Sequence, residues 1–540
     1  MNVAEGWKNN AGYKFWIYAQ LGVLISIFCY LFAENFVMSD SWEVLSLRSI
    51  DDYAMQDSLR SMQKAILSGD WKRVFGFFDY AYGNAYWLIN AIILLPLYFI
   101  DNAQILIIAG RQISLIFVFL SIYVVSLIID RIRPDAGSIK YAVLISIAAM
   151  PMVPIIATKY HVNAQVVFLG LLSFYILLRG STLEYRSQVL SSLVAGLAVG
   201  FKLTSVIILP LLGLVLLTRL RQQGDKRLIK SILTYIVITI VTAAACTAPR
   251  ILLFPFFIDE LGATYRTFVL FKNMASTGGH QVSTLIVDGL GFYLSPFTLL
   301  FVFLLFIILA FNDLKNRSYI TLYIFITIIV SITAVVIAVD KAPIYIATYL
   351  ISLGFLLPLG FLGIVNLKFP SAVKVTIVYS IVITGLILGY DYRKQLFSVY
   401  TINFFEIAKS ERVIRQIKAL EEMRALVTPL KRPVRILQDS SSIFPATRFM
   451  EGVDVAINYG DLKEKSTWGR FDYILLNSRD YYGKRVSSSV RKEGFDISGL
   501  TGADLEEMTR EILYKKGEYY GRKYSLIYEG YDALLYKLEE

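Results

Sequence analysis

The sequence predicts a polytopic α-helical membrane protein that carries a soluble α/β domain at its C-terminal end. Of its 540 residues, 56% are hydrophobic and 18% are charged, and the mean hydropathy is +0.57. Soluble domains carry roughly 25% charged residues. The apolar residues form blocks about as long as the roughly 20 residues that a helix needs to cross a bilayer. These observations exclude a disordered chain, a collagen, a coiled coil and an ordinary cytosolic enzyme.

The apolar blocks predict about eleven membrane crossings. The predicted spans are 15–33, 105–129, 139–157, 164–178, 189–200, 203–217, 229–248, 292–311, 319–338, 344–365 and 375–390. The pair 189–200 and 203–217 fits a hairpin that is broken at Gly200-Phe201-Lys202. The stretch 87–100 has two interpretations, a short crossing or a helix that lies along the membrane interface.

Positively charged residues set the predicted orientation. The net charge is +11, which would indicate nucleic acid in a soluble protein. Here the excess lies in short loops between apolar blocks, so it reports topology and no nucleic-acid partner is expected. The loops that should be cytoplasmic carry Arg131, Arg133, Lys140, Arg179, Arg186, Arg219, Arg221, Lys226, Arg227, Lys230, Lys315, Arg317, Lys368 and Lys374. Lys8 and Lys14 place the N-terminus in the cytoplasm too. All these loops and the N-terminus can lie on the cytoplasmic side together only if the stretch 87–100 does not fully cross the membrane.

Two regions follow from this topology. Residues 1–390 form a transmembrane module in the inner or plasma membrane, with outer loops at 34–104 and 249–291. Residues 391–540 form an extracytoplasmic accessory domain, with strands at 434–437 and 473–476, a helix at 505–514 and a terminal hairpin at 525–528 and 533–536. The first apolar block lacks a cleavage site and should stay as an anchor. Cys29 and Cys246 lie inside apolar blocks, so neither a disulfide nor a metal site is expected from them.

The first outer loop opens with an amphipathic helix. Met55, Leu59, Met62 and Ile66 recur on one helical face. Such a helix can rest on the membrane surface with its apolar side in the headgroup region. It would place Asp51 and Asp52 at the lipid–water boundary, where a carboxylate can act as a general base on a hydroxyl. The alternative is that Asp51 only caps the helix.

Five further sequence patterns follow one another in chain order: Asp51-Asp52-Tyr53-Ala54, Gly69-Asp70-Trp71, residues 82–88, Lys159-Tyr160-His161-Val162-Asn163 and residues 196–204. Together these five segments resemble GT-C glycosyltransferases, in particular the protein-mannosyltransferase and aminoarabinose-transferase types. The pattern covers residues 1–220, and the remainder is similar in architecture only. The chain departs from the family in two places. Its segment 84–87 lacks the usual proline, and its second outer turn has His161 and Asn163 where an acid is often found.

The resemblance implies an integral membrane enzyme that takes a sugar from a polyprenyl-phosphate donor and transfers it with inversion to a hydroxyl of a glycan, lipid or protein. The family's first-loop acid, its catalytic base, corresponds to Asp51 or Asp52. The acid of the second outer turn is associated with a metal in some members. Because that acid is replaced here, the sequence does not support a metal site, although a divalent metal stays open as an alternative, and no other cofactor is implied.

Several cations on the predicted outer face are candidates for the donor phosphate. Arg111 lies near the outer end of its span, and Lys202 lies at the break of the hairpin. Ionisable residues at membrane depth are costly and often functional, and a cation can stabilise a leaving phosphate. Lys341 is a second possible phosphate contact. The alternative for Lys202 and Arg111 is that they reach to the lipid headgroups.

Candidates for sugar binding are the two histidines, His161 and His280, which both fall in predicted outer loops, and Asn163 beside the first of them. Aromatic rings suit the apolar face of a sugar. The first outer loop supplies Trp71, Tyr82 and Tyr86. The alternatives are histidines without a role and aromatic residues that only anchor the chain at the interface.

Two other functions fit a polytopic membrane protein. A flippase for lipid-linked saccharides would need polar residues within spans or a pair of repeats with broken helices, and the sequence shows few of the former and none of the latter. A polysaccharide polymerase or ligase that uses a diphosphate-linked donor is the other alternative. Such enzymes usually use arginines of outer loops in place of an acidic pair in the first loop.

Overall fold

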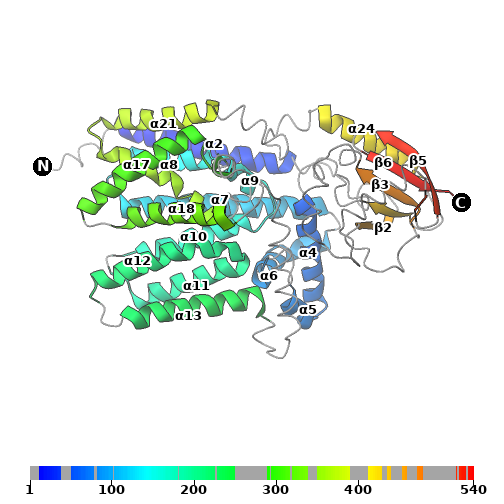
Figure 1. Cartoon of the computed structure of the whole chain (residues 1–540), viewed down its shortest axis with the longest axis horizontal. Helices are drawn as coiled ribbons and strands as arrows, with labels where there is room; N and C mark the ends of the chain where they lie inside the picture. The colour runs from blue at the N-terminus through cyan, green and yellow to red at the C-terminus, as the bar shows by residue number, and fades with distance from the viewer. Residues whose placement is uncertain are drawn as a thin grey trace. The chain divides into compact units, whose positions relative to one another are not determined.

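A computed structural model describes residues 11–37, 50–77, 82–100, 103–180, 182–224, 228–249, 289–291, 293–316, 319–338, 350–388, 411–427, 434–438, 453–458, 471–477, 518–519, 522–530 and 533–539. They fall into two compact units. The first holds the helices up to α21, and the second holds α24 and the strands (Figure 1). Each unit is described by itself.

The first unit is a bundle of apolar helices. Its elements are α2 (Ala11–Val37), α7 (Ala103–Ile132), α8 (Ser138–Ala148), α9 (Met152–Ala157), α10 (Asn163–Leu178), α11 (Tyr185–Phe201), η2 (Leu203–Ile208), α12 (Leu209–Gln222), α13 (Leu228–Thr247), α17 (Pro296–Lys315), α18 (Ile320–Ala338), α20 (Ile351–Gly354), η3 (Leu357–Asn366) and α21 (Ser371–Leu388). Among the described residues, five helical segments, α2, α7, η2 with α12, α13 and α17, are long and apolar enough to cross a membrane. The predicted fold class is therefore confirmed, and the number of crossings stays a prediction.

Three predicted spans differ in detail from the structure. The first span continues to Val37, so Glu34 is a buried helical residue and does not begin the outer loop. The span 139–157 is divided into α8 and α9 at Pro151, which ends the first helix. The described part of 344–365 is a short α-helix followed by the 3-10 helix η3. At Gly363 of η3 an added Cβ would lie 2.1 Å from the carbonyl oxygen of Leu305, so glycine allows this element to approach α17 closely.

The first outer loop contains α4 (Ile50–Leu67), α5 (Trp71–Gly76), α6 (Asn84–Ile93) and η1 (Leu95–Phe99). The predicted amphipathic helix is confirmed as α4. The prediction that its apolar side faces lipid headgroups is wrong, because Met55, Leu59 and Met62 are buried in the protein core. These side chains belong to the continuous apolar core of the protein, and Gln63 Nε2 of α4 donates to the carbonyl oxygen of Ala91 of α6 at 3.4 Å.

The short helix α6 settles how the stretch 87–100 is built. Its ten residues span only about 15 Å, half the thickness of the hydrocarbon core. One side of α6, with Tyr86, Trp87 and Asn90, is buried, while Ile92 and Ile93 on the other side are exposed. The helix α6 alone is therefore too short to cross, and its two-sided surface is typical of an interfacial helix. Whether the whole stretch, which continues into η1, crosses the membrane stays a prediction.

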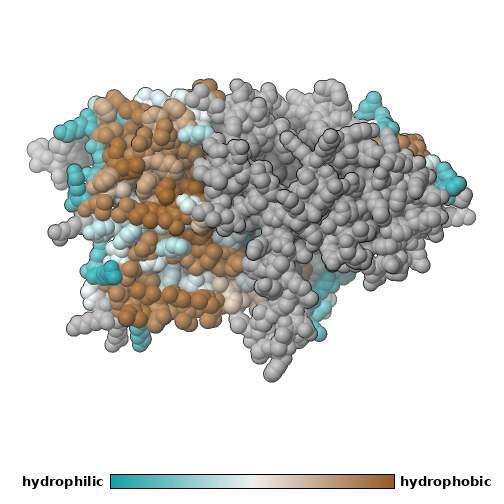
Figure 2. Space-filling model, viewed as in Figure 1, coloured by the Kyte–Doolittle hydropathy of each residue, from teal (hydrophilic) through white to brown (hydrophobic). Residues whose placement is uncertain are grey.

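The described basic residues of the loops that are predicted to be cytoplasmic lie at one end of the bundle, which we call the basic end. It is formed by the last turns of α7, α10, α12 and α17 and by the first turns of α8, α11, α13 and α21. Arg219 Nη2, for example, donates to the carbonyl oxygen of Gly180 at 3.0 Å. Figure 2 shows a broad apolar band across the helices with hydrophilic residues gathered at its left margin. The helices α4, α5 and α6 lie at the opposite end, which we call the α6 end (Figure 1).

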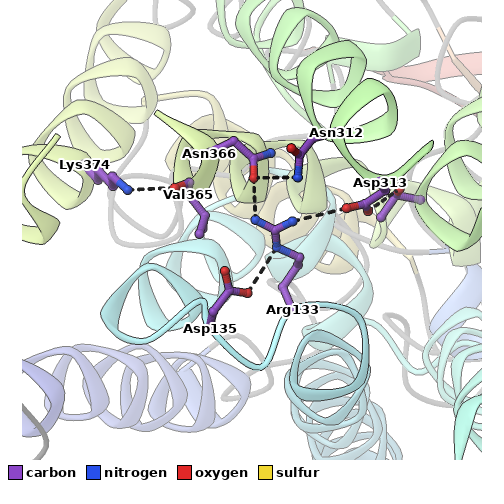
Figure 3. Close-up of polar contacts among 8 residues, drawn as sticks. Arg133, Asp135, Asn312, Asp313, Val365, Asn366 and Lys374 are labelled. Atoms are coloured by element: carbon purple, nitrogen blue, oxygen red, sulfur yellow. Dashed lines mark hydrogen bonds and ion pairs between the residues drawn. The ribbon is translucent and has the colours of Figure 1, made fainter. Parts of the chain in front are cut away.

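A polar cluster ties helices together at the basic end (Figure 3). Arg133, which follows α7, donates from Nη1 to Asp313 Oδ1 of α17 at 3.2 Å and from Nη2 to Asn366 Oδ1 of η3 at 2.6 Å. Its Nε lies 3.2 Å from Asp135 Oδ1. The second oxygen of Asp313 accepts from Thr321 Oγ1 at 2.7 Å. The buried ion pair between Arg133 and Asp313 thus joins the end of α7 to α17. Hydrogen bonds of the same two side chains connect η3 and α18 to it.

Replacing Arg133 with alanine should lower the free energy of unfolding by about 3–5 kcal/mol, because it leaves the buried carboxylate of Asp313 without its counter-charge. The thermal unfolding midpoint in detergent measures this. Arg131 is the matched control, since it lies in the last turn of α7 and is exposed. A midpoint that falls equally in both variants would contradict the assigned role of the ion pair.

The second unit contains a six-stranded sheet with the order β2-β1-β3-β6-β5-β4. Its strands are β1 (Val434–Gln438), β2 (Val453–Asn458), β3 (Tyr473–Asn477), β4 (Glu518–Tyr519), β5 (Arg522–Gly530) and β6 (Ala533–Leu538), and α24 (Glu411–Leu426) packs against β5. Strands β1, β2 and β3 are parallel, and β6, β5 and β4 continue the sheet in antiparallel pairs. The predicted strands and terminal hairpin are confirmed. The elements β2, β4 and α24 were not predicted, and the predicted helix 505–514 lies outside the described residues.

Candidate functional site

Two segments far apart in the sequence meet at the α6 end. The backbone N–H of Gly83 donates to the carbonyl oxygen of Phe201 at 3.1 Å, and Tyr82 forms an antiparallel bridge with Lys202. Lys202 is the residue at which α11 ends and η2 begins. The break predicted at residues 200–202 is therefore the point where the first loop attaches to the bundle.

Two glycines allow this attachment. A Cβ added to Gly83 would overlap the carbonyl oxygen of Gly200 at 1.8 Å and would lie 2.9 Å from the Cα of Thr247. A Cβ on Gly200 would lie 2.4 Å from the Cβ of Cys246. The ends of α11 and α13 and the residues before α6 thus touch through their backbones, and only glycine fits at positions 83 and 200.

Replacing Gly83 with alanine should force these backbones apart, which costs about 1–3 kcal/mol for overpacking and shifts Tyr82 relative to Lys202. We expect a lower thermal midpoint and a loss of activity together. Gly22 is the matched control, because its Cβ would meet nothing within 4 Å. If Gly83→Ala behaved like Gly22→Ala, the close approach would be wrong.

Four polar side chains gather at this junction, and we call them the Lys202 cluster: Tyr82, His161, Asn163 and Lys202. Lys202 Nζ donates to Asn163 Oδ1 at 2.7 Å and lies 6.0 Å from the centre of the Tyr82 ring. The Tyr82 hydroxyl is hydrogen-bonded to His161 Nε2 at 2.5 Å. The backbone N–H of Asn163 donates to His161 Nδ1 at 3.2 Å. These described contacts place the ammonium beside an amide oxygen and an aromatic face.

The imidazole of His161 is held in its neutral form. Burial and, after it, the positive charges of Lys202 and Lys159 keep the pKa of His161 well below its ordinary value. That ordinary value is about 6.5. The ring therefore adds no positive charge near neutral pH, and the cationic group of the cluster is Lys202.

Buried aromatic rings pack against Tyr82 of the Lys202 cluster. Tyr86 packs edge-on against Tyr82 with 5.8 Å between ring centres and against Phe201 with 5.7 Å. It also contacts Trp87 at 5.1 Å. Tyr86 and Trp87 are fully buried. Tyr86 is thus placed as a packing residue behind Tyr82, which favours a supporting role over the predicted sugar contact.

The structure brings together only some of the predicted site residues. Arg111 is buried in α7, and its role in phosphate binding stays a prediction. Trp71 is 55% exposed and stacks on Phe75 of its own helix, which fits the interfacial-anchor alternative. Asp51 and Asp52 lie in the first turn of α4, but their side chains lie outside the described part of the chain. His280 and Lys341 lie outside it entirely.

Sequence reasoning missed the residues that build the junction. Gly83 and Gly200 were read as parts of motifs and not as contact points, and Phe201 was not singled out. Nothing in the sequence pairs position 83 with position 200, because the contact depends on how α11 and α13 pack. Among the described residues no group of three His, Cys, Asp or Glu side chains could hold a metal, and metal dependence stays a prediction.

Comparison with solved structures finds chains of the same architecture. ArnT from Cupriavidus metallidurans in the apo state gives a TM-score of 0.53 at 13% identity over 97% of this chain and 98% of that chain. The chain has the GT-C fold. ArnT bound to undecaprenyl phosphate gives 0.49 at 13% identity over 95% and 98%. An Archaeoglobus fulgidus oligosaccharyltransferase in complex with Zn and sulfate gives 0.42 at 11% identity over 84% and 68%.

Neither a scan of protein-family models nor a search of curated proteins finds a match to the chain. The GT-C fold is shown by three-dimensional similarity, and the apolar helices and the C-terminal α/β unit of this chain agree with it.

Proposed function

We propose that the chain is a glycosyltransferase that moves a sugar from a polyprenyl-phosphate donor to a hydroxyl of a lipid, glycan or protein. The observation that carries the proposal is the Lys202 cluster, which places an ammonium at the α6 end of a membrane bundle beside hydrogen-bonding side chains. A phosphate bound there would have its lipid tail in the bilayer and its sugar in water. The GT-C fold and the first-loop acids are consistent with this chemistry.

The proposed orientation places the α6 end outside the cytoplasm. The basic end would then face the cytoplasm, as positively charged loops generally do. Nucleotide sugars are made inside the cell, so an enzyme at the outer face needs a donor that has already crossed the membrane. A sugar on a polyprenyl phosphate meets this need.

The proposed reaction is a single displacement with inversion. Asp51 or Asp52 removes the proton of the acceptor hydroxyl, and the acceptor oxygen forms its bond to the anomeric carbon of the sugar. The bond from that carbon to the phosphate oxygen breaks, and its electron pair stays on the phosphate. Lys202 stabilises the negative charge that develops there.

The experiment that tests the proposal supplies purified protein in lipid nanodiscs with radiolabelled sugars on a synthetic polyprenyl monophosphate and on the corresponding diphosphate. Transfer to membrane-derived acceptors from the monophosphate donor is expected. Transfer only from the diphosphate donor would favour a polymerase or ligase. Movement of the intact donor between leaflets, without cleavage, would favour a flippase.

A further inference from the structure

We propose that the Tyr82 hydroxyl is a second hydrogen-bond donor to the donor phosphate, and that His161 is the positioning residue that orients it. The inference rests on the proposed function and deepens it, because it assigns phosphate recognition to a phenol and an ammonium acting together. It also changes the predicted roles of His161 and Asn163 from sugar contacts to groups that arrange the two donors.

The first step concerns the hydrogen on the His161 ring. The backbone N–H of Asn163 points at Nδ1 at 3.2 Å, so Nδ1 is the acceptor nitrogen. A neutral imidazole carries its single hydrogen on the other nitrogen. That nitrogen is Nε2, which lies 2.5 Å from the Tyr82 hydroxyl oxygen. His161 therefore donates, and Tyr82 accepts.

The second step follows for the phenol. A hydroxyl that accepts at its oxygen directs its own hydrogen away from the group that donates to it. Donation from Nε2–H also withdraws electron density from the phenol oxygen, which strengthens the O–H as a donor, since linked hydrogen bonds polarise one another. His161 thus fixes both the direction and the strength of the Tyr82 hydroxyl.

The third step places this donor beside Lys202. The backbone bridge between Tyr82 and Lys202 fixes the two residues side by side, and the ammonium lies 6.0 Å from the phenol ring centre. Asn163 connects both: its backbone N–H sets the His161 ring, and its side-chain oxygen holds Lys202 Nζ at 2.7 Å. Asn163, at the start of α10, therefore helps to position both the Tyr82 hydroxyl and the Lys202 ammonium at the same junction.

The fourth step is chemical. When the sugar leaves, charge develops on phosphate oxygens, and one ammonium cannot contact all of them. Hydrogen bonds to ionised acceptors are short and about twice as strong as neutral ones. A phenol beside the ammonium would hold a second oxygen and would favour a compact tetrahedral oxyanion over a planar carboxylate.

The test measures binding of undecaprenyl phosphate to the purified full chain, together with kcat and KM once a donor sugar is found. Tyr82→Phe removes only the hydroxyl and should weaken binding about 10-fold or more, as expected for a hydrogen bond to a charged group. Tyr123→Phe is the matched control, because Tyr123 lies exposed on α7, and it should leave binding unchanged.

A double-mutant cycle tests whether His161 acts through Tyr82. His161→Leu should weaken binding as much as Tyr82→Phe, and the double variant should bind no worse than either single one. His161→Gln keeps an N–H at the place of Nε2 and should restore most of the affinity. Additive losses in the double variant, or equal binding of the Leu and Gln variants, would overturn the positioning role.

The outcomes separate this inference from the proposed function. If Lys202→Ala weakens binding and Tyr82→Phe does not, the second donor is wrong and the phosphate site stands. If neither variant weakens binding, the phosphate site itself is wrong. Tyr82→Phe keeps the ring and the backbone. It therefore decides whether the Tyr82 hydroxyl binds the phosphate, even if His161→Leu lowers the thermal midpoint.

Discussion

Replacing Lys202 with alanine should lower kcat/KM for sugar transfer about 100-fold or more, the loss typical of removing one preorganised donor from a developing oxyanion. Lys202 supplies the ammonium of its cluster, and its Nζ is already held by Asn163 Oδ1 at 2.7 Å. The ammonium therefore needs little reorganisation when charge appears on the phosphate. Initial rates with a labelled polyprenyl-phosphate sugar measure the effect.

Two further variants sharpen this prediction. Lys72→Ala is the matched control, because Lys72 is exposed at the start of α5, and it should keep wild-type activity. Asn163→Asp places a carboxylate against the ammonium. It should raise the KM for the donor by competing with the phosphate, while the fold is kept. Equal rates for Lys202→Ala and Lys72→Ala would remove Lys202 from the mechanism.

Replacing the proposed catalytic acid of α4 with its amide should reduce transfer by about 10²–10⁴-fold, the contribution of a general base. Asp51→Asn and Asp52→Asn are made separately, because the resemblance leaves the two positions open. One of them should lose activity while expression and thermal midpoint stay at the wild-type level. An amide keeps the size and the helix-capping oxygen of aspartate, so a residue that only caps the helix should tolerate the change.

Asp57→Asn, on the same helix, serves as the control for this pair. Full activity in both Asp51→Asn and Asp52→Asn would mean that neither acid is the base. Full loss in both would indicate that the two carboxylates act as a pair.

If one of these acids is the general base, the transfer rate should fall as the pH drops through the pKa of that acid. The residual rate of the amide variant should not show this pH dependence.

Much of the architecture follows from the sequence because it depends on composition and local periodicity. The apolar blocks, the basic loops and the stripe of Met55, Leu59 and Met62 each predict an element that the structure contains. The environment of that stripe was predicted wrongly. A helix with an apolar face looks the same in sequence whether lipid or protein covers it, and here the protein core provides the cover.

The candidate site was predicted in its members and not in its arrangement. Tyr82, His161, Asn163 and Lys202 were each singled out, from motifs or from their places in outer loops, and the structure brings them together. Their pairing depends on the contact between positions 83 and 200, which only tertiary packing creates. The roles predicted for Arg111 and Trp71 from depth and residue type stay predictions, since the structure shows one buried in α7 and the other exposed on α5.

A cryo-electron microscopy structure of the purified chain in nanodiscs with undecaprenyl phosphate tests the central claim most directly. The phosphate density should lie at the α6 end, within hydrogen-bonding distance of Lys202 Nζ and beside the Tyr82 hydroxyl, with the first turn of α4 facing the same space. Phosphate density at the basic end, or at the α6 end but out of reach of Lys202, would contradict the account.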